Sequence, residues 1–192
     1  MAHPERVVTP AAAPSPGAHP SSPLDDLSWD ELLALGEQHE RRGEGARARE
    51  AYELAIWRIG ESSTPGRTSS VMRWIARTWQ LEANYDAALD CLTAAEAVAE
   101  AGGDTVAFGH ALNMRGVVHW QRGELDIAQT LYRRALDVAR ATSDARLAAT
   151  TAQNLGVVAN VRGDYDAALG YYSASLELSL PGAGARHLHR PE

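Results

Sequence analysis

The sequence predicts an all-α fold in which four similar helix pairs stack into a solenoid. Three observations indicate this: similar residues recur every 40 positions, small and large residues alternate among them, and glycine recurs where a helix would end. Of the 192 residues, 45% are hydrophobic and 22% are charged, which is ordinary for a chain that buries a core.

The beginning of the chain differs in composition from the rest. The first 26 residues hold most of the prolines and lack a periodic hydrophobic pattern, so we predict a disordered tail over residues 1–26. Ser28 is a favourable N-cap, and Glu31 three residues later completes a capping box. We therefore expect the first helix to begin at Ser28.

The repeat is defined by columns of residues that stand 40 positions apart. A small residue, called the anchor below, recurs at Gly36, Ala76, Gly116 and Gly156. Seven positions later stand Gly43, Ala83, Gly123 and Gly163, and 16 positions after the anchor stand Tyr52, Leu92, Tyr132 and Tyr172. We expect a close helix contact at the anchor, a left-handed helix end at the second column, and large side chains at the third that interdigitate with the first helix.

Each unit is expected to contain a helix, a turn and a second helix. Thr64, Asp104 and Asp144 precede the first helices of repeats two to four and are expected to cap them. The predicted repeats span residues 27–66, 67–106, 107–146 and 147–180, and a flexible tail is expected over residues 181–192. Four repeats exceed the number of about three that a stable stack needs.

The columns resemble those of the tetratricopeptide repeat, with the best match in "NLGVVANVRGDYDAALGYYSAS", residues 154–175. The 40-residue period is similar to that of the long repeats in kinesin light chains and Leu-Gly-Asn repeat proteins. Ala76 and Ala83, where the other repeats have glycine, depart from the pattern. The resemblance implies a right-handed superhelix with a concave groove that binds peptides or partner proteins, and it implies no catalysis.

Groove residues are predicted from first-helix positions that face away from the second helix. Arg73 and Arg77 lie one helical turn apart and could hold a partner's carboxylate, or they could pair with Glu37 and Glu40 instead. Trp120 could anchor an apolar partner side chain or pack against the next helix. The candidate groove residues are Arg73, Arg77, His110, Asn113, Val117, Trp120, Gln153, Val157 and Asn160.

The last predicted helix has an apolar side for which the sequence offers no convincing capping helix. Leu176 and Leu180 are therefore expected to be partly uncovered, which marks an association site. The alternatives are a partner protein, a second copy of the chain, or a chain that is a fragment of a longer protein.

Composition and motifs narrow the function. The net charge of −7 argues against binding of nucleic acid, and no apolar run is long enough for a membrane span. We found no catalytic, cofactor-binding or metal-ligating pattern, and the start lacks a secretory signal, so a cytoplasmic location is expected. The sequence predicts a non-catalytic adaptor that binds a protein or peptide; the alternative is a regulatory sensor for a short peptide or small ligand.

Overall fold

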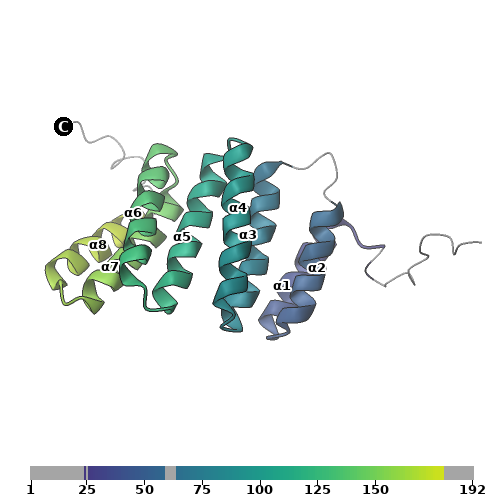
Figure 1. Ribbon diagram of the computed structural model, residues 1–192. Helices are drawn as coiled ribbons and strands as arrows, with labels where there is room; N and C mark the ends of the chain where they lie inside the picture. Colours follow the sequence, from purple (N-terminus) through teal and green to yellow (C-terminus); the bar gives the residue numbers. More distant parts are fainter. Residues whose placement is uncertain (1–23, 25, 59–63, 180–192) are drawn as a thin grey trace, which may run out of the picture.

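The computed structural model describes residues 24, 26–58 and 64–179, and in this part of the chain eight helices follow one another as antiparallel neighbours (Figure 1). Most of the predicted N-terminal tail, and all of residues 181–192, lie outside the described residues. The helices are α1 (Trp29–Arg41), α2 (Gly45–Arg58), α3 (Pro65–Leu81), α4 (Tyr85–Ala101), α5 (Thr105–Gln121), α6 (Leu125–Ala141), α7 (Ala145–Val161) and α8 (Tyr165–Ser179).

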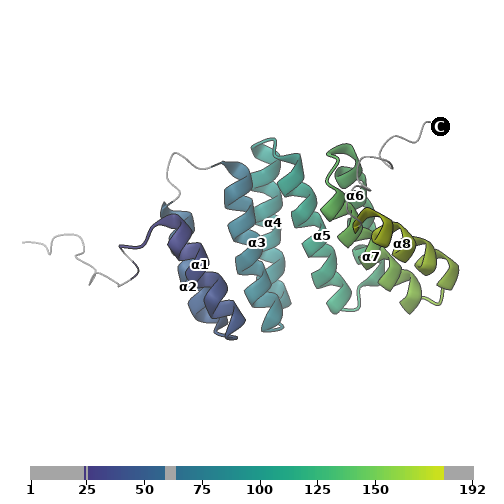
Figure 2. The same cartoon turned by 180° about the vertical axis from the view of Figure 1, so that it is seen from behind.

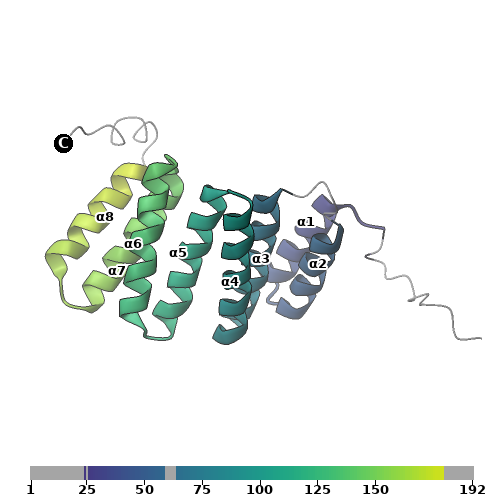
Figure 3. The ribbon, with the colours of Figure 1, turned by 45° about the horizontal axis from the view of Figure 1, so that its top comes forward.

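The helices form a two-layered solenoid, as the sequence predicts. Helix α3 contacts α5 and α5 contacts α7, whereas the even-numbered helices make few or no contacts with one another. From α3 onward the odd-numbered helices are therefore the closely spaced layer, and the view from behind shows them in order along the array (Figure 2). The helix axes rotate from α3 to α8, so the stack turns along its length (Figure 3). No helix in the described part is long and apolar enough to cross a bilayer.

The turn within each pair has the predicted left-handed residue. The backbone φ is +75° at Gly43 and +57° at Ala83, and +79° at both Gly123 and Gly163. Ala83 adopts this conformation although it has a side chain, which costs roughly 1–2 kcal/mol relative to glycine. The turns between pairs also have a left-handed residue, at Gly103 (+68°) and Ser143 (+56°).

The anchor column packs against the large residue of its own pair. A Cβ atom placed on Gly116 would lie 2.6 Å from the ring of Tyr132, so no side chain fits there. Where the anchor is Ala76, its neighbour in the core is Leu92, which has no ring. The three glycine–tyrosine pairs are Gly36 with Tyr52, Gly116 with Tyr132, and Gly156 with Tyr172.

The predicted helix caps are formed at three of four positions. Ser28 and Glu31 make the reciprocal capping box at the start of α1. Asp104 accepts the N–H of Ala107 at 2.8 Å, and Asp144 caps α7 in the same way. Thr64 occupies the N-cap position of α3 without a side-chain capping hydrogen bond.

Candidate functional site

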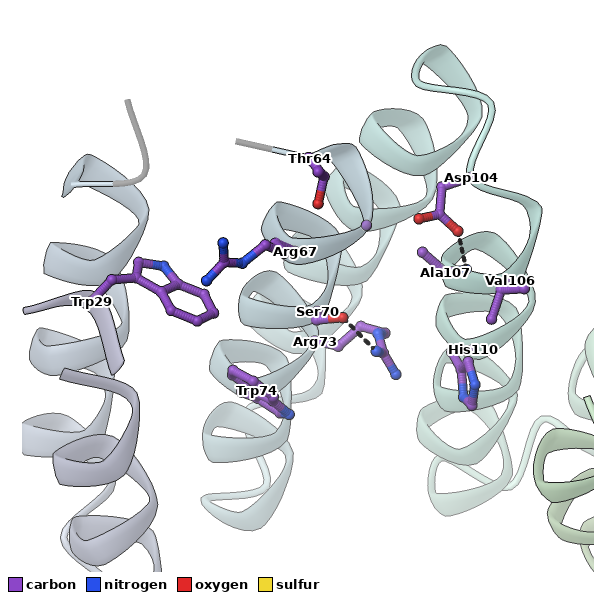
Figure 4. A pocket seen from close by; sticks show the side chains of 11 residues that line it. Trp29, Thr64, Arg67, Ser70, Arg73, Trp74, Asp104, Val106, Ala107 and His110 are labelled. Carbon is purple, nitrogen blue, oxygen red and sulfur yellow. Dashed lines mark hydrogen bonds between the residues drawn. The ribbon is translucent and has the colours of Figure 1, made fainter. Parts of the chain in front are cut away.

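A pocket of about 650 Å³ lies between the first three odd-numbered helices. Figure 4 shows its lining side chains, which come from α1, α3 and α5 and from the residues just before α3 and α5. The lining residues include Trp29, Gly66, Arg67, Ser70, Arg73, Trp74, Asp104, Val106 and His110.

Arg73 is the central cation of this pocket. It extends from α3 toward α5 (Figure 4), and its Nη2 donates a hydrogen bond to Ser70 Oγ at 2.9 Å. Its Nε is buried without a hydrogen-bond partner, and no carboxylate of the described residues forms an ion pair with it. Burial, and to a lesser degree repulsion by Arg146, lowers the pKa of the Arg73 guanidinium, while Asp104 opposes the shift. The pocket thus holds a partly desolvated positive charge that is incompletely paired.

A second arginine lies at the rim beside two tryptophans. The Arg67 guanidinium lies 3.8 Å from the centre of the Trp29 ring, a cation–π contact that holds both side chains at the pocket edge. Trp74 lines the same pocket and packs against Tyr52, with ring centroids 5.7 Å apart. The pocket therefore combines positive charge with broad apolar surfaces.

His110 lies across the pocket from Arg73 and contacts Asp144, the residue that caps α7 of the next helix pair. Its Nε2 lies 2.9 Å from Asp144 Oδ2. Burial and the nearby Arg73 lower the pKa of His110, although Asp144 opposes the shift. We therefore treat His110 as a neutral hydrogen-bonding group near pH 7.

Asp104 is the acidic residue of the pocket, and its carboxylate caps a helix. Asp104 Oδ1 accepts the N–H of Ala107, which caps α5. Gly66 allows this approach, because a Cβ atom on Gly66 would overlap the Asp104 carboxylate. Arg67 and Arg73 outnumber this single carboxylate, so the pocket has a net positive character.

Arg73 and His110 are the two predicted groove residues that line this pocket. Arg77 instead pairs with Glu40 at 2.8 Å, and the Glu40 side chain is only 4% exposed, so the internal pairing considered from the sequence is the observed one for Arg77. Asn113 is also engaged, because its Oδ1 accepts hydrogen bonds from Thr151 and Asn154 of α7.

The remaining predicted groove residues lie outside the pocket. Val117 is partly buried against the core between α6 and α7, and Val157 is half-buried. Trp120 is 37% exposed, and Gln153 and Asn160 are exposed. At the predicted C-terminal edge Leu176 is 65% exposed, while Leu180 lies outside the described residues.

Sequence reasoning missed Trp29 and Arg67, although both break the pattern of their columns. The column of Trp29 otherwise holds the small buried residues Ser69, Gly109 and Ala149. The column of Arg67 otherwise holds Leu27 and the buried Ala107 and Leu147. These departures from the column pattern were the available signal for the pocket, and it was overlooked because groove positions were assigned uniformly to every repeat.

In the described part of the chain, no group of three or more His, Cys, Asp or Glu side chains is arranged to hold a metal ion. The pocket's side chains can recognise a ligand by charge, hydrogen bonds and apolar contact. An anionic group would complement Arg73 and Arg67, and an apolar group would fit against Trp74 and Val106.

Comparisons with known proteins agree with this architecture. Residues 108–180 match the tetratricopeptide repeat family model. The fold is similar to that of BtubC (BKLC) from P. vanneervenii, with 18% identity and a TM-score of 0.69 over 80% of this chain and 63% of that chain. A comparison of the sequence with curated proteins gives no match.

Two other similar structures are longer still. The Rap conjugation gene regulator of plasmid pLS20, in complex with the Phr* peptide, is 17% identical with a TM-score of 0.67 over 77% of this chain and 41% of that one. Aspartyl phosphate phosphatase F from Bacillus subtilis is 16% identical with a TM-score of 0.71 over 79% and 40%. This chain spans less than two thirds of the length of BtubC and of both these proteins, and the identities show a shared fold.

Proposed function

Because residues 108–180 match the tetratricopeptide repeat and the whole array has that fold, we propose that the chain is a non-catalytic adaptor. Its site is the pocket between α1, α3 and α5, and its ligand is an acidic, extended peptide segment of a partner protein. The observation that supports this most strongly is the half-buried guanidinium of Arg73, whose Nε is fully buried without a hydrogen-bond partner.

The energetic reason is the cost of a buried charge. A desolvated cation without an anionic partner destabilises a fold unless another group compensates for it. A ligand carboxylate at Arg73 would supply that compensation through a charge-assisted hydrogen bond. A bound anion would therefore offset the desolvation cost of the Arg73 charge, which nothing offsets fully in the unliganded protein.

The size and lining of the pocket suit a few peptide residues. A volume of about 650 Å³ lies within the range of sites that hold small ligands, and it is too small for a whole helix. Arg67 at the rim would contact a second acidic group, while Trp74 and Val106 would contact an apolar side chain. We therefore expect a preference for segments with acidic residues next to a hydrophobic one.

A second candidate is a sensor that binds a free short peptide and changes the curvature of the solenoid. The similarity to the Rap regulator solved with the Phr* peptide favours it, as does a pocket lined by three successive odd-numbered helices. The two functions differ in their ligands. A sensor should show a peptide-dependent thermal shift with no protein present, whereas an adaptor should co-purify with a defined protein.

The test uses a fluorescein-labelled hexapeptide with two glutamates, one leucine and a free C-terminal carboxylate. Removing one partner of a charge pair that binding would bury typically costs about 2 kcal/mol or more, so Arg73→Met should weaken binding at least about tenfold. Arg133→Met, at an exposed position on α6, is the matched control and should leave affinity unchanged. Equal affinity for wild type and Arg73→Met would refute the proposed site.

Stability separates a binding role of Arg73 from a structural one. Because Arg73 has no carboxylate partner among the described residues, Arg73→Met should keep or raise the free energy of unfolding. A marked loss of stability would show that the arginine supports the fold instead. Arg77 is unsuitable for this test, since its removal would leave the buried Glu40 without its partner.

Catalysis has its own control, because one similar structure is that of a phosphatase. We expect the purified chain to hydrolyse acetyl phosphate no faster than buffer does. Hydrolysis that tracks the protein concentration would contradict a non-catalytic adaptor.

A further inference from the structure

The outer side of α8 resembles a repeat-to-repeat interface that has no neighbour among the described residues. Leu169, Tyr172 and Leu176 are 64%, 37% and 65% exposed, and Asp166 beside them is also exposed. We call these four residues the terminal face. In the preceding repeat, the counterparts of Tyr172 and Leu176 are Tyr132 and Leu136, which are buried.

The third repeat shows what covers such a face. The second helix of the pair, α6, packs against the first helix of the next pair, α7. The α6 side of this core consists of Ala128, Tyr132, Leu136 and Ala139, and the α7 side consists of Leu147, Ala148, Leu155 and Val158.

Arginines bridge repeats two and three, and repeats three and four, along the same interface, whereas Glu82 occupies this column between repeats one and two and pairs with Arg49. Arg122, after α5, pairs with Asp86 of α4 at 2.8 Å. Arg162, after α7, pairs with Asp126 of α6 and donates a second hydrogen bond to Gln129. Asp166 is the next residue in the column of Asp86 and Asp126, and it forms no ion pair with the described residues.

We propose that the terminal face docks an amphipathic helix of a partner protein that carries an arginine just after its apolar stripe. The pattern required is that of α7, in which Ala148, Thr151, Leu155 and Val158 face α6 or α5 and Arg162 follows four residues later. The apolar side chains would cover Tyr172 and Leu176, and the arginine would reach Asp166. This surface is distinct from the Arg73 pocket and lies at the other end of the array (Figure 1).

Charge disfavours pairing of α8 with α8 of a second copy. Tyr165, Leu169, Tyr172 and Leu176 have the spacing of a coiled-coil seam. However, α8 contains the acidic residues Asp166 and Glu177 and no basic residue, so two copies would bring like charges together. The partner helix must therefore be basic where α8 is acidic.

Head-to-tail stacking of two copies is also disfavoured, because α1 is polar where it would have to be apolar. Gln38 of α1 stands in the column of Thr78, Val118 and Val158, which are all buried. Glu31 stands in the column of the buried Val71, Ala111 and Thr151. Stacking α1 on α8 would bury both polar side chains without evident partners.

The two kinds of contact have different roles. The ion pairs of the series are solvent-exposed, with Asp126 95% and Asp86 89% exposed, and such pairs contribute at most about 1 kcal/mol. Apolar contact with Tyr172 and Leu176 must supply most of the affinity. The arginine would then determine the register in which the helix lies.

The probe for the first experiment is a fluorescein-labelled peptide with the sequence of residues 145–162, added to the full-length chain. We expect one peptide to bind per chain, measured by fluorescence anisotropy and isothermal titration calorimetry. Leu176→Asp should weaken binding at least about tenfold, because it places a charge in the apolar contact. Leu81→Asp, at another exposed leucine, is the matched control and should have no effect. The comparison of Leu176→Asp with Leu81→Asp also excludes a second explanation, in which the peptide displaces α7 from the array. Leu176→Asp would not weaken that exchange.

A charge swap tests the register. Asp166→Arg should weaken binding about fivefold, and the peptide with Arg162→Asp should restore affinity to that variant. Asp137→Arg, at an exposed acid of α6, should change nothing. If the swapped peptide fails to restore binding, the arginine pattern is wrong.

Other outcomes overturn the proposal in distinct ways. A concentration-dependent dimer in light scattering that Leu176→Asp abolishes would assign the face to a second copy. No peptide binding by a monomeric chain would mean that the face is not a helix-docking site. Arg73→Met should leave binding of the 145–162 peptide to the terminal face unchanged. The terminal-face proposal and the Arg73-pocket proposal can therefore fail independently of each other.

Discussion

The two ends of the solenoid differ in the side chains that they present at the positions where interior repeats stack on one another. At α1, Gln38 stands where interior repeats bury Val118 and Val158. At α8, Leu176 is 65% exposed where its interior counterpart Leu136 is 7% exposed. The N-terminal end is thus polar at stacking positions, while the C-terminal end retains interior-type residues. A residue's place in the repeat determines its neighbours within the pair, but its place in the array determines whether it is buried.

The largest difference between the ends is expected at the tyrosine column. Tyr52 is fully buried and Tyr172 is 37% exposed, although both pack on a glycine anchor. Tyr52→Ala should lower the free energy of unfolding by about 3–5 kcal/mol, because it leaves a cavity. Tyr172→Ala should cost only about 1–2 kcal/mol. Urea denaturation measures both, and equal losses would show that the terminal face is covered in solution.

Overpacking the anchors should give the next largest effect. Gly36→Leu and Gly116→Leu place a side chain against a buried tyrosine ring, which should cost roughly 1–3 kcal/mol. Gly156→Leu should cost less, since Tyr172 can move toward solvent. Thermal unfolding of the three variants checks the order, and a Gly156→Leu loss as large as the others would contradict it.

The ion pairs at the two ends should also differ in how much they contribute to the free energy of unfolding. Removing Arg77 leaves the Glu40 carboxylate, 4% exposed, without its partner, and such a loss typically costs about 1–3 kcal/mol. Arg162→Ala breaks a pair whose aspartate is 95% exposed and should cost less than about 1 kcal/mol. Urea denaturation of both variants at neutral pH provides the measurement. A reversed order would mean that Glu40 is paired by another group.

The N-terminal end should weaken as the pH rises. Burial raises the pKa of Glu40 above its ordinary value of 4.5, with Arg77 opposing the shift. The folded state therefore holds this proton more tightly than the unfolded state, so its stabilising effect is present at low pH and is lost as the pH rises through the raised pKa. Glu40→Gln should remove this component of the pH dependence, measured as the difference in unfolding free energy from wild type between about pH 4 and pH 8. Parallel curves for the two proteins would contradict the assignment.

The smallest expected effect is a change in association. Glu31→Ala with Gln38→Val makes the outer side of α1 resemble an interior stacking surface. Head-to-tail contact with α8 should then appear as weak, concentration-dependent dimers in light scattering. Gln153→Val, an exposed glutamine on α7, is the control. If the double variant stays monomeric at high concentration, the polar residues of α1 are not what prevents stacking.

The columns of the sequence predicted what depends on a helix pair's own residues. The contact between Gly116 and Tyr132 and the left-handed turn at Ala83 are of this kind, because spacing within one unit determines them. Leu176 is also exposed among the described residues, as expected. Among the residues that the structure describes, these features match the expectation closely.

The candidate site depended on features that spacing does not determine. Arg73 and Arg77 lie one turn apart, yet one bonds to Ser70 within its own helix and the other to Glu40 of the previous pair. That difference depends on the shift between neighbouring pairs and on side-chain rotamers. Trp29 and Arg67 were missed because groove positions were assigned uniformly to every repeat, whereas the pocket forms where the repeats are unlike one another.

The left-handed turns have a consequence for how this molecule can change length. Turns within pairs and turns between pairs both place one residue at φ between +56° and +79°. The turns that follow α1, α3, α4, α5, α6 and α7 therefore each contain one left-handed residue. A tandem duplication of 40 residues that begins at any such turn would regenerate the same junctions and the same helix register. The array can therefore grow by copying itself, and the residues at its two ends would remain where they are.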